Sequence, residues 1–474
     1  MAAVHREISN RSTPEPAGAR PEPEAFRVVI AGAGVAALEA ILALREAVGD
    51  RAEITLLAPD AELFHRPLAT LAPFRIDGTR AIPLTRLADD LDFTHHRDRL
   101  AGIDTPGRVV TTVAGTELRY DALLVAIGAR AESAIPGAIT YSGPASAGEL
   151  ETVLDSIRSE TIGRLAFAIP PVARWSLPVY ELAVLTGRYA RRHGLSLEST
   201  IATHEHAPLE LFGERPSEGV RQLLAIAGIE LRAGAAPVAA RGGALRLANG
   251  DAIAADAVLA LPRFVAPPIP GLPQGPAGFV PTDAYMRVDG LDRVWAVGDI
   301  TWFPIKQGGL ATQQADAAAS SIARAIDPEL TARPFAPVLR AALTTGWTPY
   351  YLRASMTGAG EPAASKAPLW WPPSKVAGRL LGSYLAEHDG DHLPPPLEDL
   401  DDPVAEGSER EADHLDALEL ALTAADLDAR AADYEGALRW LDVAERLNLT
   451  LPDAYSGKRD RWRAQQLIEH EAAP

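Results

Sequence analysis

The first regular pattern along the chain is an apolar run followed by apolar residues at helical spacing. Residues 26–30, FRVVI, form the run, and AGAGVAALEAILALREAVG follows it directly. This pattern predicts a short strand, a glycine-containing turn and a helix. A second strand is predicted over residues 52–60, AEITLLAPD. We therefore expect an α/β unit in this part of the chain.

The alternation of strands and helices returns between residues 164 and 261. Strands are predicted at RLAFAIP, SLESTIATHE and DAVLALP, and helices at PVYELAVLTGRYARRHG and from Ser217 onward. Two other apolar stretches, LRYDALLVAIGAR and RVWAVGD, precede and follow this second unit. The first of them is predicted as a strand that ends at Gly128, after which the chain leaves the first unit.

The turn after the first strand has the spacing GxGxxA, formed by Gly32, Gly34 and Ala37. Gly32 permits a tight turn, Gly34 lets a pyrophosphate approach the backbone, and Ala37 lets the helix pack close to the strand. The helix N-terminus favours an anion. Because a strand precedes this turn and a helix follows it, we expect the turn to bind a dinucleotide.

An acidic residue near the end of the second strand, about 20 residues beyond the glycines, binds the adenosine ribose in such units. The aligned position here is Ala58, and the nearest acid is Asp60. We therefore expect that Asp60 reaches back to the ribose, or that backbone and water hold it.

Three motifs in order, GxGxxA, YDALLVAIGA and VWAVGD, resemble those of the FAD flavoproteins with two dinucleotide-binding domains. This group is the pyridine nucleotide-disulfide oxidoreductase superfamily, and the resemblance covers roughly residues 26–340. It implies an α/β fold with two Rossmann-like (FAD/NAD(P)-binding) domains, the first discontinuous. Apolar residues at helical spacing after the acidic segment predict, in addition, a C-terminal α-helical appendage. The implied cofactor is non-covalently bound FAD.

The resemblance also implies roles for residues near the last motif. Asp299 would bind the ribityl–pyrophosphate region of FAD, with Gly298 allowing close approach and Gly128 lying at the end of the middle strand. The next helix would direct its N-terminus, around Gly309 and Leu310, at the N1–C2 carbonyl edge of the flavin. Reduced flavin is negative there, and a helix N-terminus stabilises negative charge.

The chain contains no cysteine, which excludes disulfides, thiolate nucleophiles and cysteine-ligated metals. Its motif order, with FHRPLATLAPF and PIKQGG, is similar to the group of sulfide:quinone oxidoreductase, flavocytochrome c sulfide dehydrogenase and type II NADH dehydrogenase. Sulfide oxidation in that group relies on cysteines, so sulfide is a poor candidate substrate. The chemistry that remains is hydride or electron transfer through the flavin alone.

The turn that would bind a nicotinamide nucleotide in the second unit is atypical. It reads PPVARWSLPVYELA, and no glycine occurs between Gly163 and Gly187. Prolines lack the N–H donors that a phosphate needs. Glu205 lies about where an acid would bind the nicotinamide nucleotide's ribose, so NAD(P)H remains an open alternative as electron donor.

Candidate residues for the acceptor side follow the last motif. GLATQQADAAA is similar to the helix that lines the quinone pocket in type II NADH dehydrogenases, so Gln313 and Gln314 are candidate quinone ligands. The alternative is that both amides only support the FAD site, since glutamine is a good helix former. Lys306 could stabilise negative charge on the flavin, or it is a solvated loop lysine.

Composition and charge argue against several other classes of function. The net charge is −18, and residues 396–474 hold 20 Asp and Glu against 8 Lys and Arg, so no basic face for nucleic acid is expected. His204 and His206 flank Glu205 but are predicted loop residues, so no metal site is expected. No apolar run reaches about 18 residues, and residues 1–25 read as a disordered leader. The predicted location is cytoplasmic.

The expected domain boundaries follow from these patterns. The FAD-binding domain is predicted at 26–145 and 281–340, and the second dinucleotide-binding-like domain at 146–280. An interface region is predicted at 341–390, an acidic, proline-rich linker at 391–412, and a tetratricopeptide-like helical appendage at 413–472.

The interface region has two interpretations. Its Trp370, Trp371, Lys375 and Arg379 have the composition of a segment that lies on a membrane surface. Alternatively, the two tryptophans cover the flavin domain or a homodimer interface. The helical appendage is a candidate site for a protein partner.

The function expected from these features is that of an FAD-dependent oxidoreductase without redox cysteines. It would pass electrons to a quinone or another small acceptor. An NAD(P)H-dependent flavin reductase is one alternative. A flavin-binding scaffold whose helical tail recruits a partner is the alternative of another class.

Overall fold

The computed structural model describes residues 25–65, 69–74, 80–346, 349–356, 362–366, 368–370, 373–389, 434–446 and 451–472, and residues 422, 425, 426 and 429. The leader up to residue 24, Trp371 and the linker 391–412 lie outside these residues. Within the described ranges, no helix is long and apolar enough to cross a bilayer.

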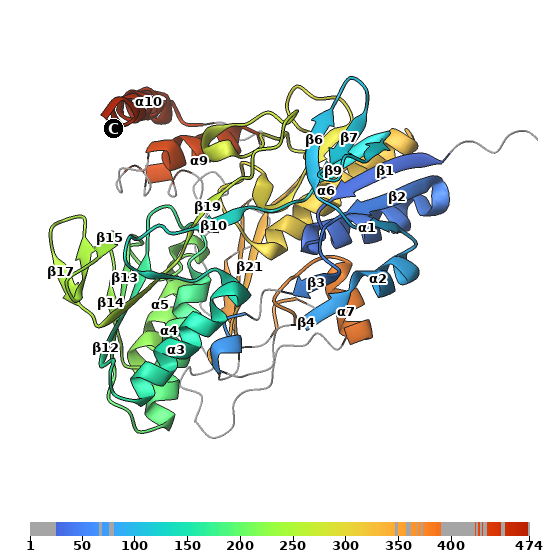
Figure 1. Ribbon diagram of the computed structural model, residues 1–474. Helices are drawn as coiled ribbons and strands as arrows, with labels where there is room; N and C mark the ends of the chain where they lie inside the picture. Colours follow the sequence, from blue (N-terminus) through green and yellow to red (C-terminus); the bar gives the residue numbers. More distant parts are fainter. Residues whose placement is uncertain are drawn as a thin grey trace, which may run out of the picture.

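The first α/β domain is built on a five-stranded parallel sheet with the order β20-β9-β1-β2-β5 (Figure 1). Helices α1 (Val35–Val48) and α6 (Gly308–Ile326) pack against each other beside it. Its outer strand, β20, follows the whole second domain in the sequence, so the first domain is discontinuous. The strands are β1 (Phe26–Ala31), β2 (Ala52–Leu57), β5 (Thr94–His96), β9 (Ala122–Val125) and β20 (Val294–Ala296).

Both faces of this sheet are covered, which explains why β9, β20 and most of β1 are apolar and buried. Val28 and Ile30 of β1 pack into the core that contains α1 and α6, whereas Val29 and Ala31 pack into a second core. An antiparallel sheet contributes to that second core through β6 (Leu100–Asp104), β7 (Val109–Thr112) and β8 (Glu117–Arg119).

The second α/β domain repeats this plan with the strand order β11-β18-β12-β13-β14, again parallel. The strands are β11 (Ile139–Thr140), β12 (Arg164–Ile169), β13 (Glu198–Thr203), β14 (Ile229–Arg232) and β18 (Ala257–Ala260). β11 lies in this sheet, although residue 145 was the boundary expected from the sequence. The helices are α3 (Ala147–Arg158), α4 (Leu177–Arg192) and α5 (Glu214–Ile226), and α5 begins three residues before Ser217.

Small antiparallel elements complete and connect the two domains. A three-stranded sheet packs on the second domain. The two segments that carry the chain between the domains form a two-stranded antiparallel ribbon, which contains an ion pair between Arg263 and Glu132. A hairpin followed by a helix extends the first domain. These elements are β15 (Pro237–Ala240), β16 (Ala244–Leu247), β17 (Ala252–Ala254), β10 (Arg130–Glu132), β19 (Arg263–Val265), β3 (Glu62–His65), β4 (Arg80–Pro83) and α2 (Leu84–Leu91).

The region after α6 forms a three-stranded antiparallel sheet of β21 (Val338–Leu343), β22 (Tyr350–Ser355) and β23 (Ala363–Ser365). β21 contacts both α4 and α6, so this sheet lies between the two α/β domains (Figure 1). Helix α7 (Leu381–Asp389) then returns to α1.

The helical appendage packs on the body of the protein. Helices α9 (Tyr434–Arg446) and α10 (Asp453–Ala472) contact each other, with an ion pair between Arg459 and Glu445. Trp440 of α9 is 0% exposed, and its ring meets that of Phe303 edge-on at 6.5 Å between centroids. The appendage therefore covers part of the loop between β20 and α6.

Candidate functional site

The turn between β1 and α1 can accept an anionic ligand. Gly32 has φ +108°, and a Cβ there would lie 2.3 Å from the carbonyl oxygen of Ala126. Gly34 is the N-cap of α1; no side chain caps this helix end, and a Cβ at Gly34 would have no atom within 4 Å. Ala37 is fully buried in the main core. These features fit the pyrophosphate of a dinucleotide, because no side chain caps this helix N-terminus and the space beside Gly34 is open.

The end of β20 forms the second part of this site. Gly298 has φ +76°, and a Cβ there would lie 3.6 Å from the Cβ of Ala311 and 3.7 Å from that of Ala36. The loop therefore runs between the first turns of α1 and α6. Gly298 donates its N–H to the Gln314 side chain at 2.7 Å, and the half-buried Asp299 follows it.

Helix α6 begins close to the start of α1. A Cβ at Gly308 would lie 3.7 Å from Val35 and 3.4 Å from Val376. Gln307 caps the helix: its side-chain oxygen accepts the N–H of Leu310 at 2.9 Å. The N–H of Leu310 is thus satisfied within the protein, and the expected role of the helix N-terminus around Gly309 and Leu310 at the flavin stays a prediction.

The three expected acceptor-side residues have partners inside the protein. The amide of Gln313 bonds to both backbone groups of Val338, and Gln314 is buried with its oxygen on Gly298. Lys306 donates to the carbonyls of Thr301 and Phe303, at 2.7 and 2.8 Å. These contacts favour supporting roles over direct contact with a substrate.

Gly128 and Asp60 differ in what they offer a ligand. Gly128 has φ +70°. A Cβ at Gly128, like one at Gly34, would have no atom within 4 Å. Asp60 is exposed, three residues beyond the end of β2, and the carbonyl of the buried Ala58 is bonded to His95. No cluster of potential metal ligands occurs among the residues that the structure describes, including His204 and His206.

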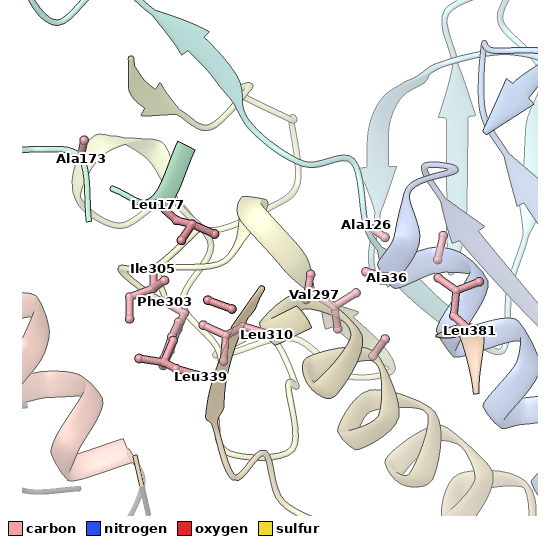
Figure 2. Close-up of a cluster of buried hydrophobic side chains, with 14 of the residues drawn as sticks. Ala36, Ala126, Ala173, Leu177, Val297, Phe303, Ile305, Leu310, Leu339 and Leu381 are labelled. Carbon is pink, nitrogen blue, oxygen red and sulfur yellow. The ribbon is translucent and has the colours of Figure 1, made fainter. Parts of the chain in front are cut away.

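Apolar side chains from both domains meet beside the two helix N-termini (Figure 2). Leu177 of α4 belongs to the same buried cluster as Phe303, Ile305 and Leu310 on the β20–α6 side. We call this region, together with the first turns of α1 and α6, the domain junction. It supplies an apolar environment next to the turn that fits a pyrophosphate.

The corresponding turn of the second domain is filled by its own side chains. Glu205 is 5% exposed, and its carboxylate accepts hydrogen bonds from Ser176 at 2.8 Å, Tyr180 at 2.6 Å and Thr203 at 3.0 Å. Burial raises the pKa of this carboxyl. Ser176 is the N-cap of α4. The carboxylate of Glu205, the acid expected to bind a ribose, is therefore directed at the start of α4 instead.

A buried ion pair that no local sequence pattern predicts joins four segments at the domain junction. Glu181 of α4 pairs with Lys375, and both side chains are almost completely buried. The Glu181 carboxylate also accepts bonds from Thr70 at 3.0 Å and from the hydroxyl and N–H of Thr344 at 2.7 and 2.6 Å. Burial lowers the pKa of Lys375. This lysine is therefore not available to a membrane surface.

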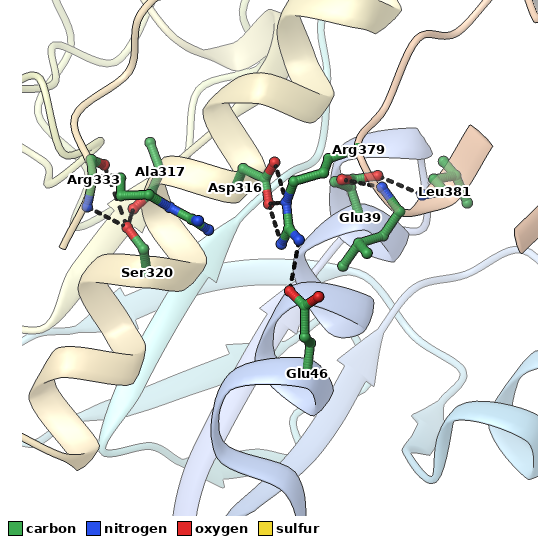
Figure 3. A network of polar contacts seen from close by, with 9 residues as sticks. Glu39, Glu46, Asp316, Ala317, Ser320, Arg333, Arg379 and Leu381 are labelled. Atoms are coloured by element: carbon green, nitrogen blue, oxygen red, sulfur yellow. Dashed lines mark hydrogen bonds and ion pairs between the residues drawn. The ribbon is translucent and has the colours of Figure 1, made fainter. Parts of the chain in front are cut away.

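Arg379, the other cation of the expected interfacial segment, is also engaged within the protein (Figure 3). It bridges Asp316 of α6, at 3.0 Å, and Glu46 of α1, at 2.6 Å. Beside it, the buried carboxylate of Glu39 accepts the N–H groups of Leu380 and Leu381, at 2.9 and 2.7 Å. Segment 379–381 is thus fixed to α1 and α6.

The pKa of Glu39 predicts a pH dependence of stability. Burial raises it from 4.5 to about 7, so between these values the folded protein holds a proton that the unfolded chain has lost. This contribution to stability is complete below pH 4.5 and is lost as the pH rises to about 7. We expect the unfolding midpoint of the wild type to fall across this window relative to that of Glu39→Gln.

Chemical unfolding at a series of pH values measures this difference. Glu53→Gln, which removes an exposed acid of β2 outside this network, is the matched control and is expected to follow the wild type. A Glu39→Gln variant whose midpoint runs parallel to the wild type would show that Glu39 does not titrate in this range.

Comparisons with known proteins agree with this geometry. Residues 26–166 match a family model described as pyridine nucleotide-disulphide oxidoreductase. An NADH dehydrogenase-like protein of Mycobacterium tuberculosis (strain ATCC 25618 / H37Rv) is 25% identical over 292 residues, which are 58% of this chain and 72% of that protein.

Solved structures share the fold at low identity. The sulfide:quinone oxidoreductase of the hyperthermophilic bacterium Aquifex aeolicus has a TM-score of 0.64 and 20% identity, over 70% of this chain and 84% of that one. The ferredoxin reductase for the CYP199A2 system of Rhodopseudomonas palustris has a TM-score of 0.52 and 18% identity, over 71% and 90%. The predicted fold class, α/β with two Rossmann-like domains, is confirmed.

Proposed function

We propose that this chain is an FAD-dependent oxidoreductase that works without redox cysteines, because residues 26–166 match the family model described as pyridine nucleotide-disulphide oxidoreductase and the chain contains no cysteine. One observation carries this proposal. The uncapped N-terminus of α1, with open space at Gly34, lies next to Gly298 and the first turn of α6.

The residues of the domain junction fit FAD in a definite way. Gly32 and Gly34 with the first turn of α1 would hold the pyrophosphate, and Gly298 with Asp299 would hold the ribityl region. FAD, when bound, supplies two-electron redox chemistry. The protein contributes the positive end of the α6 dipole, although Gln307 already satisfies one N–H there.

The electron donor in this proposal is not a nicotinamide nucleotide. Glu205 is held by three hydroxyl groups, the turn before α4 contains Pro170 and Pro171, and Pro178 lies in the first turn of α4. A nucleotide ribose would have to displace these bonds, and prolines offer no N–H to a phosphate. The likeness to an NADH dehydrogenase-like protein supports the alternative, an NAD(P)H-dependent dehydrogenase.

The acceptor in this proposal is a quinone or a similar small apolar molecule. The apolar side chains of the domain junction suit a quinone ring, and a sulfide:quinone oxidoreductase shares the fold. The amides of Gln313 and Gln314 are already bonded to backbone groups of the protein. Direct binding of the acceptor by these two residues is therefore the weaker part of the proposal.

An anaerobic titration of the FAD-loaded protein tests donor and acceptor together. We expect dithionite to bleach the visible flavin band, a soluble quinone to restore it, and equimolar NADH or NADPH to leave it unchanged. Stoichiometric bleaching by NADH would instead establish the NAD(P)H-dependent alternative. A purified protein that retains no FAD after reconstitution would contradict the proposed function itself.

A further inference from the structure

Two arginines face each other on the sheet that lies between the α/β domains. Arg340 of β21 and Arg353 of β22 are directly opposed in the antiparallel register. Both are half-buried. Their neighbours Leu339 and Leu352 point to the other face, which is part of the main core. The two guanidinium groups therefore share one face of the sheet.

Neither arginine has a carboxylate partner among the residues that the structure describes. The other cations of this region differ: Lys375 pairs with Glu181, and Arg379 bridges two acids. Burial and the charge of Arg353 lower the pKa of Arg340, and no acid opposes this effect. Like charges directly opposed on a sheet destabilise it.

The surrounding sequence reinforces this charge. Residues 331–386 contain six Lys and Arg against one acid, Glu361, in a chain whose net charge is −18. Within the sheet itself, Arg340 and Arg353 are the charged residues of β21 and β22, and no carboxylate among the described residues pairs with them. A paired guanidinium site matches the geometry of carboxylate and phosphate oxygens, which accept two parallel N–H bonds.

We propose that Arg340 and Arg353 form a binding site for a small oxyanion, a molecule that carries a carboxylate or phosphate group. Binding relieves the repulsion between the two guanidinium groups and satisfies their donors. Tyr351 lies on the same face, two residues before Arg353, and its ring is packed edge-on by Trp370 at 5.1 Å. This contact holds the strand beside the site in place.

The site adjoins the domain junction through the backbone. Gln307, the N-cap of α6, donates its side-chain N–H to the carbonyl of Arg340 at 2.7 Å. The inference does not depend on the proposed redox function, because anion binding is measurable without turnover.

Calorimetric titration of the FAD-loaded protein with inorganic phosphate and with succinate tests the site, at an ionic strength kept constant with sodium chloride. We expect saturable binding of at least one of the two anions, and at least tenfold weaker binding in both Arg340→Gln and Arg353→Gln. The preferred anion identifies the ligand class. Arg263→Gln is the matched control, since this exposed arginine already pairs with Glu132.

Thermal unfolding provides a second measurement on the same proteins. Without anion, we expect Arg353→Gln to unfold at a slightly higher temperature than the wild type, because one of two repelling charges is gone. Arg353→Lys keeps the charge but loses the paired donors, so it should bind the anion weakly while remaining folded. Wild-type protein with no saturable binding, or variants that bind as the wild type does, would overturn the proposal.

Discussion

Replacing Gly32 by alanine is expected to abolish FAD binding and to destabilise the first domain by about 3 kcal/mol or more. The added Cβ would lie 2.3 Å from the carbonyl oxygen of Ala126 and 2.6 Å from its carbonyl carbon. Both atoms belong to the backbone at the end of β9, so neither can rotate away. The φ of +108° adds strain for any residue with a side chain.

Gly34→Ala separates cofactor binding from folding. Gly34 has φ −85°, which alanine adopts readily, and its Cβ would meet no protein atom within 4 Å. We expect this variant to unfold at the wild-type temperature but to bind FAD at least tenfold more weakly, because the methyl group occupies the space assigned to the pyrophosphate.

Flavin absorbance of the purified proteins and thermal unfolding of the FAD-free proteins distinguish the two effects. A Gly34→Ala protein with wild-type FAD content would show that the pyrophosphate lies elsewhere. A Gly32→Ala protein as stable as the wild type would contradict the close approach of Ala126.

Replacing Lys375 by methionine should cost about 3–5 kcal/mol of stability, because it leaves the buried charge of Glu181 without its cation. Lys375 is 9% exposed and Glu181 is 1% exposed, so water cannot compensate. Glu181 also joins α4 to Thr70 and Thr344, and the loss should therefore loosen the contact between the second domain and the β21–β23 sheet.

A double-mutant cycle isolates the contribution of the pair. Lys375→Met together with Glu181→Gln removes both charges, and we expect it to recover a large part of the loss seen in Lys375→Met alone. The exposed pair Arg221 and Glu218 serves as the reference, with an expected cost below about 1 kcal/mol. Equal effects at the buried and exposed pairs would contradict the burial described here.

The strand and helix pattern of the chain was sufficient to predict the α/β elements and the glycine turn. FRVVI became β1, RLAFAIP became β12, and VWAVGD became β20 followed by Gly298, which lies beside both helices. Periodicity and glycine spacing are local properties, so they survive folding unchanged. Gly32 and Gly298, the glycines of those motifs, adopt positive φ values that residues with a side chain disfavour.

The contacts that decide the roles of the polar side chains could not be predicted from the sequence. Glu181 and Lys375 are 194 residues apart, and Glu39 binds the backbone 341 residues later. Nothing local marks such partners. Gln313 was a candidate quinone ligand because GLATQQADAAA is similar to the quinone-pocket helix of type II NADH dehydrogenases, but its bond to Val338 depends on where β21 packs.

The strand order of the first domain has a consequence for how the chain folds. β9 and β20 are neighbours in the sheet, although all of the second domain lies between them in the sequence. Contacts over such distances form slowly, whereas those within residues 139–260 are more local. On the ribosome the second domain is therefore expected to fold before the first. The FAD site, which needs the first turn of α6, is completed only after α6 has been synthesised.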